Sequence, residues 1–334
     1  MIVKYKYFIG IDVSKSKLDI CILNGKKVLI EECIANTVSG INHFFKKMTK
    51  LNTSNTLICC EHTGIYTHSI LDWAYQNNFS IWLEKAIQIK RSIGFQRGKN
   101  DKIDAYRIGL YAFRYQDQAT IFQRPTKEIQ EIKHLLGVRS RLLKARKQLM
   151  VPLKELKGCI GDQMYQRVLK SSKKSIQSIE DDIKKLDKNI QKTISKSNNL
   201  AKKVDCATSV EGVGIITAIT LIVATNEFKH VKSSKELACY VGVVPFAHTS
   251  GSSIRGRNRV SYFAHKPLKS LLHLCSIVAI QKPGEIKDYY DRKVKEGKPK
   301  MNVINAIRNK LIKRIYACVT QNKKYEKNYT PIFG

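Results

Sequence analysis

The stretch that decides the fold is Tyr7–Val13, which reads YFIGIDV. Its apolar residues form a short run that is typical of a buried strand, and the run closes near an acid, Asp12. Two more strands are expected at 17–23 and 26–33, with Gly25 suited to a hairpin turn between them. This part of the chain is therefore expected to hold three antiparallel strands, the first of which carries a carboxylate near its end.

Beyond these strands, strand and helix patterns alternate. Thr56–Cys60 (TLICC) predicts a fourth strand, which Glu61 follows directly. A helix over 68–76, a fifth strand over 79–84 and a helix from Asp101 to about 115 are expected next. Periodicity alone predicts an α/β domain over residues 1–120. The element order resembles that of an RNase H-like (RuvC-like) fold.

Residues 121–203 show helical periodicity and almost no strand pattern. Their apolar residues step by three and four positions, as in the a/d seam of a coiled coil, at Ile176, Ile179, Ile183, Leu186 and Ile190. Gly158 and Gly161 mark the tip of a hairpin between two antiparallel helices. The pattern predicts either a coiled-coil arm, for dimerisation or for spanning nucleic acid, or a two-helix hairpin packed within one chain.

Residues 204–334 are expected to form a mostly helical C-terminal domain that ends in a basic tail. Near its start, Val210–Gly214 precedes an apolar helix. The two glycines of this turn would let backbone amides approach a phosphate, or they would serve helix packing alone. Further on, Pro245–Arg259 (PFAHTSGSSIRGRNR) predicts a flexible Gly/Ser loop that carries basic residues.

Composition narrows the range of functions. The chain has 334 residues, with 60 Lys and Arg against 27 Asp and Glu, and its formal net charge is +33. This balance excludes an acidic disordered segment. It favours a polyanionic partner, with nucleic acid ahead of an anionic membrane surface. A lysine-rich proteome from an AT-rich genome is the alternative explanation.

Cysteine usage and hydropathy indicate the compartment. The nine cysteines include no CxxC pair and no Cys/His cluster with zinc spacing, which excludes a disulfide-stapled secreted module. Lys4, Lys6 and Asp12 interrupt the N-terminal apolar run, so no signal peptide is expected. The longest apolar stretch, about Val213 to Ala224, is too short for a membrane span. We expect a cytoplasmic protein with no membrane partner.

Four acids stand out by position. Asp12 and Glu61 end two strands that one sheet can bring together, and Asp101 and Asp104 are spaced i, i+3 on one helix face. Clustered carboxylates repel one another unless a cation lies between them. Two Mg²⁺ ions would fill that role and would support chemistry at a phosphodiester. Each acid taken singly is more simply a surface residue; the joint pattern in so basic a chain favours a metal site.

Basic residues flank the helical acids in the sequence, and the later Gly/Ser loop contains both basic residues and serines. Lys99, Lys102 and Arg107 flank the helical acids and suit contact with a backbone phosphate. The Gly/Ser loop offers serines as nucleophiles, with arginines to clamp a phosphate, at Arg255, Arg257 and Arg259. From the residues alone, a basic phosphate-contacting loop with turn serines is the simpler interpretation.

Several motifs, in this order, resemble one family: GIDVSK, CEHTG, KNDKIDA, GVG, ELACYVGVVP, TSG and RGR. From about residue 7 to about residue 280 the chain is similar to the DEDD transposases of the insertion-sequence-110 family. The resemblance implies that Asp12, Glu61, Asp101 and Asp104 are the DEDD acids of a RuvC-like domain. It also implies that Ser250 is the serine of a C-terminal transposase domain.

The resemblance implies a mechanism and partners as well. Such enzymes are DNA transposases or recombinases of prokaryotic cells, acting at the nucleoid and guided by a structured noncoding RNA that pairs with donor and target DNA. Their serine is thought to form a phosphoserine–DNA intermediate in sites built across protomers. A homo-oligomer is therefore expected, a dimer that becomes a tetramer on DNA.

One segment departs from the family pattern. After RGR the family usually reads ISKxGNxxLR, whereas this chain has Tyr262, Ala264 and His265 at the Lys, Gly and Asn positions. The basic partner is then expected at Lys266 or Lys269. Ser252 and Ser253 stay open as rival nucleophiles.

Three other functions would each require different features of the sequence. A RuvC-like metal-dependent nuclease or Holliday-junction resolvase would use water and need no serine. A non-catalytic nucleic-acid-binding protein would tolerate loss of the acids. An actin-like ATPase would need a second phosphate loop and an adenosine motif, and the sequence offers neither.

Overall fold

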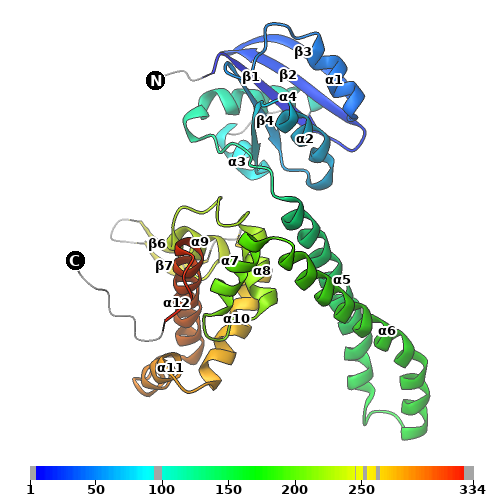
Figure 1. Cartoon of the computed structure of the whole chain (residues 1–334), viewed down its shortest axis with the longest axis vertical. Helices are drawn as coiled ribbons and strands as arrows, with labels where there is room; N and C mark the ends of the chain where they lie inside the picture. Colours follow the sequence, from blue (N-terminus) through cyan, green and yellow to red (C-terminus); the bar gives the residue numbers. More distant parts are fainter. Residues whose placement is uncertain (1–4, 94–99, 245, 251–253, 261–263, 327–334) are drawn as a thin grey trace. The chain divides into compact units, whose positions relative to one another are not determined.

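The computed structural model describes residues 5–93, 100–244, 246–250, 254–260 and 264–326. The chain divides into two compact units, Met1–Arg124 and Pro125–Gly334 (Figure 1). The first unit contains a five-stranded sheet with helices, and the second is mostly helical.

The sheet of the first unit has the strand order β3-β2-β1-β4-β5. Its strands are β1 (Tyr7–Val13), β2 (Lys17–Asn24), β3 (Lys27–Ala35), β4 (Thr56–Glu61) and β5 (Ser80–Glu84). Strands β1, β2 and β3 are antiparallel in sequence, whereas β4 runs parallel to β1 and β5 parallel to β4. Three antiparallel strands extended by two parallel ones are the arrangement of the RNase H-like fold, so this prediction is confirmed.

Helices cover both faces of the sheet, because successive residues of a strand point to opposite faces. On one face, Ile9 and Ile11 pack with residues of α1 (Val38–Lys46) and α2 (His68–Gln76). On the other face, Phe8 packs with residues of α3 (Ala86–Ile93) and α4 (Asp101–Arg114). Two short 3-10 turns, η1 (Gly64–Thr67) and η2 (Gln116–Gln118), complete the unit.

The second unit begins with two long helices, α5 (Lys127–Leu156) and α6 (Asp162–Ser195), which pack as an antiparallel hairpin. Arg139 pairs with Asp187 at 2.6 Å and Arg146 with Glu180 at 2.7 Å, and the antiparallel direction follows from this reversed order. The apolar seam of α6 is half-buried except at Ile190, which is fully buried. The hairpin within one chain agrees with the second interpretation of the pattern; dimerisation through the arm stays a prediction.

The rest of the second unit is a helical body with one hairpin. It comprises α7 (Asn198–Thr208), α8 (Ile215–Ala224), α9 (Ser234–Val241), β6 (Phe246–Ser250), β7 (Ile254–Arg259), α10 (Lys266–Gln281), α11 (Glu285–Lys295) and α12 (Lys300–Gln321). Gly212 lies between α7 and α8, where an added Cβ would come within 2.4 Å of the Cys275 carbonyl oxygen. This glycine is therefore needed for packing against α10.

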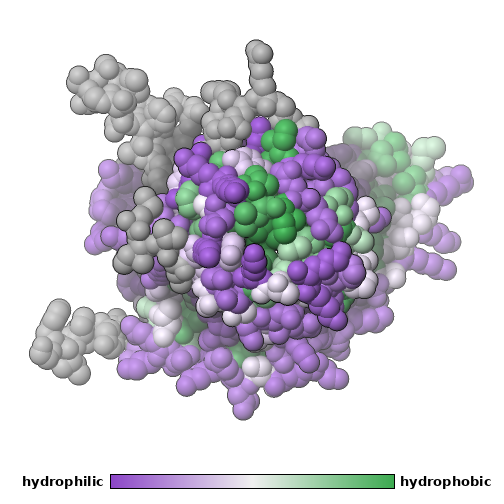
Figure 2. Space-filling model, turned by 90° about the horizontal axis from the view of Figure 1, so that it is seen from above, coloured by the Kyte–Doolittle hydropathy of each residue, from purple (hydrophilic) through white to green (hydrophobic). Residues whose placement is uncertain are grey.

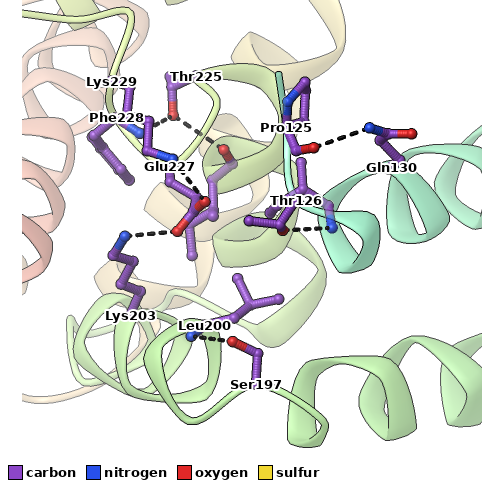
Figure 3. Close-up of polar contacts among 12 residues, drawn as sticks. Pro125, Thr126, Gln130, Ser197, Leu200, Lys203, Thr225, Glu227, Phe228 and Lys229 are labelled. Atoms are coloured by element: carbon purple, nitrogen blue, oxygen red, sulfur yellow. Dashed lines mark hydrogen bonds and ion pairs between the residues drawn. The ribbon is translucent and has the colours of Figure 1, made fainter. Parts of the chain in front are cut away.

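A strained turn follows α8, and an ion pair holds this turn against α7 (Figure 3). Asn226, Glu227 and Phe228 all have positive φ, at 47°, 60° and 66°, and the turn closes where the Phe228 amide donates to Thr225 Oγ1 at 3.1 Å. Glu227 is buried and accepts from Lys203 Nζ at 2.8 Å. Burial raises the pKa of Glu227, but its ion pairs outweigh burial and leave the pKa below its usual value.

The same close-up shows how the first turns of two helices are capped. Thr126 Oγ1 accepts from the Ile129 amide at the start of α5, and Gln130 donates to the Pro125 carbonyl at 2.9 Å. Ser197 Oγ accepts from the Leu200 amide at the start of α7.

The surface is largely hydrophilic in the view of Figure 2, as the charge of the chain leads one to expect.

Candidate active site

The sheet places two of the predicted acids next to each other. In the parallel pair of β1 and β4, Ile11 lies opposite Cys60. Asp12 and Glu61 each follow one position later, so the two carboxylates lie at the same edge of adjacent strands. Both side chains are half-buried.

Helix α4 brings the other two acids to this edge. Asn100 caps the helix by accepting from the Lys102 amide at 3.1 Å, and Asp101 and Asp104 lie in the first turn. The helix rests directly on β1, because a Cβ on Gly10 would come within 2.1 Å of the Ala105 carbonyl oxygen. The position two residues before Asp12 therefore has to be glycine for α4 to lie where it does.

The other three acids act electrostatically on Asp12. The pKa of Asp12 is raised from 3.8 to about 6, first by burial and then by the charges of Asp104, Asp101, Glu61 and Asp19. Such a rise is expected when several carboxylates share one site. The predicted set thus converges on Asp12.

Asp19 is a fifth acid that the sequence analysis missed. It lies directly across from Asp12 in the antiparallel pair of β1 and β2 and is 5% exposed. The register of the hairpin is fixed by a tight turn at Ser14–Lys17, in which the Ser14 amide donates a hydrogen bond to the Lys17 carbonyl oxygen. A turn predicted at this place in the sequence could have located Asp19. Counting equal steps from that turn places Asp19 opposite Asp12.

Two cations, Lys17 and Arg107, neutralise acids of the cluster. The sequence pattern did not predict this role for either of them. Lys17 Nζ lies 2.6 Å from Asp101 Oδ2 and 3.1 Å from Asp19 Oδ2, and these hydrogen bonds raise the pKa of Lys17 above its usual value. Arg107, expected to contact nucleic acid, pairs with Asp104 at 3.1 Å. The ammonium of Lys17 occupies a place between carboxylates where a bound cation would also be favoured.

The donor set suits a hard divalent cation, since carboxylate oxygens are the ligands that Mg²⁺ prefers. The strongest indication is the raised pKa of Asp12, which a nearby cation would relieve. Within the described ranges, no three His, Cys, Asp or Glu side chains lie close enough together to hold one ion. A cation that binds Asp101 would compete with Lys17, whose Nζ lies 2.6 Å from Asp101 Oδ2.

The segment predicted as a flexible Gly/Ser loop forms a hairpin instead. Strands β6 and β7 pair antiparallel, and Ser250, the last residue of β6, lies opposite Ile254. The prediction of a loop over the whole of Pro245–Arg259 was wrong, because the residues on either side of the Gly-Ser-Ser sequence pair as strands. Ser252 and Ser253 lie outside the described residues.

The predicted basic contacts divide into placed and unplaced residues. Three arginines lie on strand β7, whose backbone is described: Arg255, Arg257 and Arg259. Lys99 lies outside the described residues. Lys102 is exposed in the first turn of α4. Lys266 is exposed at the start of α10, and Lys269, one turn of helix onward, is half-buried.

An RNase H-like sheet with carboxylates at the ends of β1 and β4 and on α4, which packs on the sheet, is typical of enzymes that cut or join nucleic acid strands, generally with divalent metal ions. Two family models match the chain. One, for DEDD transposases of the IS110 group and described as a transposase, matches residues 9–156. The other, described as transposase IS116/IS110/IS902 family, matches residues 204–291. The chain belongs to the IS110 family of transposases and is a DNA transposase or recombinase.

Relatives agree with this assignment. The pilin gene-inverting protein of Moraxella bovis is 27% identical over 337 residues, which cover 96% of this chain and 98% of the relative. The transposase for insertion sequence element IS1111A of Coxiella burnetii is 23% identical over 252 residues, covering 67% of this chain and 58% of the relative. A structure of T. thermophilus RuvC in complex with Holliday junction substrate aligns with 35% of this chain and 100% of its own, at 13% identity and a TM-score of 0.29.

No helix in the described ranges combines the length and the apolar composition that crossing a bilayer requires.

Proposed function

We propose that the chain is an RNA-guided DNA recombinase that uses Asp12, Glu61, Asp101 and Asp104 as a metal site and Ser250 as a nucleophile. The observation that carries the metal site is the convergence of acids from two strands and a helix on Asp12, whose pKa rises to about 6. The observation that supports the serine is its position at the end of β6, which pairs with the arginine-bearing strand β7.

Two Mg²⁺ ions are the proposed cofactors, held by the four acids, and they would stabilise negative charge on the attacked phosphate and on the leaving oxygen. The acids of this chain would each contribute oxygens, with Asp12 ionised once the cation is present. Lys17 would give up Asp101 and become free to contact a backbone phosphate. Lys102, exposed beside Asp101, is proposed to make a similar contact.

The proposed serine step is a transesterification. The Ser250 oxygen would form a bond to a DNA phosphorus, the bond from that phosphorus to a deoxyribose oxygen would break, and the serine proton would leave with that oxygen as a hydroxyl. A deoxyribose hydroxyl of the other DNA would then attack the phosphoserine and restore Ser250. The number of phosphodiester bonds is conserved, so no nucleotide cofactor is needed.

The remaining partners are proposals on the strength of the family resemblance and the charge. A net charge of +33 suits a protein that holds a guide RNA together with donor and target DNA. We propose a dimer that becomes a tetramer on DNA, working at the nucleoid in the cytoplasm.

Recombination in vitro tests the proposal, with the purified full chain, the candidate noncoding RNA, Mg²⁺ and paired donor and target DNA. The expected result is joined product together with a covalent protein–DNA adduct that Ser250→Ala abolishes. Ser270→Ala, on an exposed position of α10, is the matched control and should retain both. Adduct formation that survives in Ser250→Ala but not in Ser252→Ala or Ser253→Ala would reassign the nucleophile. Joined product without any RNA would contradict guidance by RNA.

DNA inversion is a second candidate, because a pilin gene-inverting protein matches the chain over nearly its full length. The chemistry would be the same, but both sites would lie in one DNA molecule. A plasmid with two sites in opposite orientation, assayed beside separate donor and target plasmids, distinguishes the two reactions. Cleavage of either substrate without joining would favour a nuclease instead.

A further inference from the structure

Arg308 of α12 is a buried cation in the second unit, with 7% of its surface exposed. Its NH2 group lies 2.7 Å from Nδ1 of His273 on α10. Because a guanidinium can only donate, Nδ1 of His273 must accept, and the imidazole carries no proton on that nitrogen. The contact therefore provides a hydrogen bond but no negative charge.

Arg308 has no acidic partner among the residues that the structure describes. All 27 Asp and Glu residues of the chain lie in its described part, and none of them there forms an ion pair with Arg308. Its other contacts are weak, at 3.5 Å to Asn305 Oδ1 and 3.7 Å to Met301 Sδ. Its Nε is buried and has no hydrogen-bond acceptor among the described residues.

The surroundings of Arg308 add positive charge. Lys269 lies one turn before His273 on α10; burial lowers its pKa, and the charge of Arg308 lowers it further. Burial also lowers the pKa of Arg308. An uncompensated buried charge is costly, and charges in such places normally have a counter-ion. Arg308, where α10 packs against α12, thus carries a buried positive charge that no carboxylate of the described residues balances.

Hydrogen bonds connect α12 and α10 to the two ends of the segment that carries Ser250. Asn305, one turn before Arg308 on α12, donates from Nδ2 to the Val243 carbonyl at 2.8 Å, shortly before β6. His265, after β7, donates its amide to the Tyr240 carbonyl at 2.9 Å and caps α10. The two helices lie side by side (Figure 1). A ligand held by Arg308 would therefore lie in the same body as the hairpin.

An exposed methionine lies against the guanidinium of Arg308. Met301 Sδ lies 3.7 Å from its NH2 group, and 59% of the surface of Met301 is exposed, whereas Arg308 itself is 7% exposed. Methionine is unbranched and adaptable, so an anion could displace the thioether. Arginine presents a planar fork of donors that matches phosphate oxygens.

We propose that Arg308, His273 and Lys269 form a pocket for one phosphate group of the DNA backbone. The need for an anion follows from the buried charge of Arg308 and its unsatisfied Nε, and the choice of DNA follows from the transposase family. The pocket would hold the strand while the hairpin acts on it. It does not depend on which serine reacts, nor on the metal.

The test compares Arg308→Met with Arg314→Met in the full chain. Both changes remove one positive charge from α12, but the guanidinium of Arg314 pairs with Glu285 at 2.5 Å. Binding of a labelled 20-base-pair duplex of arbitrary sequence is measured by anisotropy over a range of KCl concentrations. We expect Arg308→Met to weaken binding about tenfold and to reduce the slope of log K against log salt by about 0.9. Arg314→Met should change neither value.

Thermal unfolding without DNA separates binding from folding. Removal of an uncompensated buried charge should leave the melting temperature of Arg308→Met equal to or above that of the wild type, whereas Arg314→Met should lower it. Inorganic phosphate at constant ionic strength should protect the wild type more than Arg308→Met. Lys269→Met should share the loss of slope.

Three results would overturn the proposal. A lower melting temperature in Arg308→Met with an unchanged slope would make the arginine structural. Loss of slope on an RNA of equal length, but not on DNA, would assign the pocket to RNA. Protection by phosphate with unchanged DNA binding would leave a site for the free anion only. None of these measurements involves strand transfer, so none of these results would contradict the proposed recombinase activity.

Discussion

Replacement of Asp12 by asparagine should stabilise the first unit while it abolishes recombination. The rise of the Asp12 pKa from 3.8 to about 6 corresponds to about 3 kcal/mol at neutral pH, at 1.36 kcal/mol per pKa unit. Solvent screens charges at a half-buried site, so we expect about 1–2 kcal/mol in favour of Asp12→Asn without metal. The carboxylate is retained at a cost in stability, as expected of a group needed for chemistry.

The effect should depend on pH in a defined direction. Folded Asp12 holds its proton more tightly than unfolded Asp12, so the wild type loses stability as the pH rises from about 4 to about 6. Asparagine does not titrate. The advantage of Asp12→Asn should therefore be close to zero below pH 4, grow between pH 4 and 6, and be complete at pH 7.

Tryptophan fluorescence during guanidinium unfolding measures this change in the right unit. The chain has two tryptophans, Trp73 and Trp82, and both are buried in the first unit. Curves at pH 4 and pH 7.5 with chelator present give the difference, and Asp117→Asn, at an exposed position, is the control. The reasoning is refuted if Asp12→Asn is less stable than the wild type at pH 7.5, or if its advantage is the same at both pH values.

Three further predictions concern the same framework. Gly10→Ala should cost about 3 kcal/mol in fluorescence-monitored unfolding, because the added Cβ would overlap the Ala105 carbonyl oxygen; a loss below about 1 kcal/mol would show that α4 can shift freely. Glu227→Ala should cost about 3 kcal/mol at neutral pH by helix circular dichroism, since it breaks a buried ion pair, and the cost should shrink as acid protonates the wild-type carboxyl through its lowered pKa; a constant cost would contradict this. Lys17→Met should tighten Mn²⁺ binding by up to about fivefold in calorimetry, because the ammonium no longer competes for Asp101; weaker binding would make Lys17 a supporting residue instead.

The sequence was sufficient for the elements that follow simple periodicity. The strand that ends at Glu61 and the helix that begins at Asp101 have boundaries that the apolar pattern and the acids mark directly. Their placement in one sheet followed from the element order. Asp19 was missed because its strand was interpreted from hydrophobic alternation, and the register across the hairpin was not counted.

Features that depend on packing between distant segments could not be predicted. Arg308 and His273 are 35 positions apart, and nothing in either local pattern indicates that α10 and α12 bring them together. The ion pair of Lys17 with Asp101 spans 84 positions. Both contacts are set by how elements pack in three dimensions, which a single sequence pattern does not encode.

The bare contact between β1 and α4 has a consequence for how this protein can vary. Gly10 and Gly109 let the two backbones meet without a side chain between them, and a Cβ on Gly109 would come within 3.2 Å of the Gly10 nitrogen. The spacing between Asp12 and the acids of α4 is therefore set by main-chain atoms, not by the size of core residues. Apolar side chains elsewhere in the unit can drift in volume across homologues while the carboxylates keep their separation, so we expect sequence divergence in the core to be tolerated far better than any change at these two glycines.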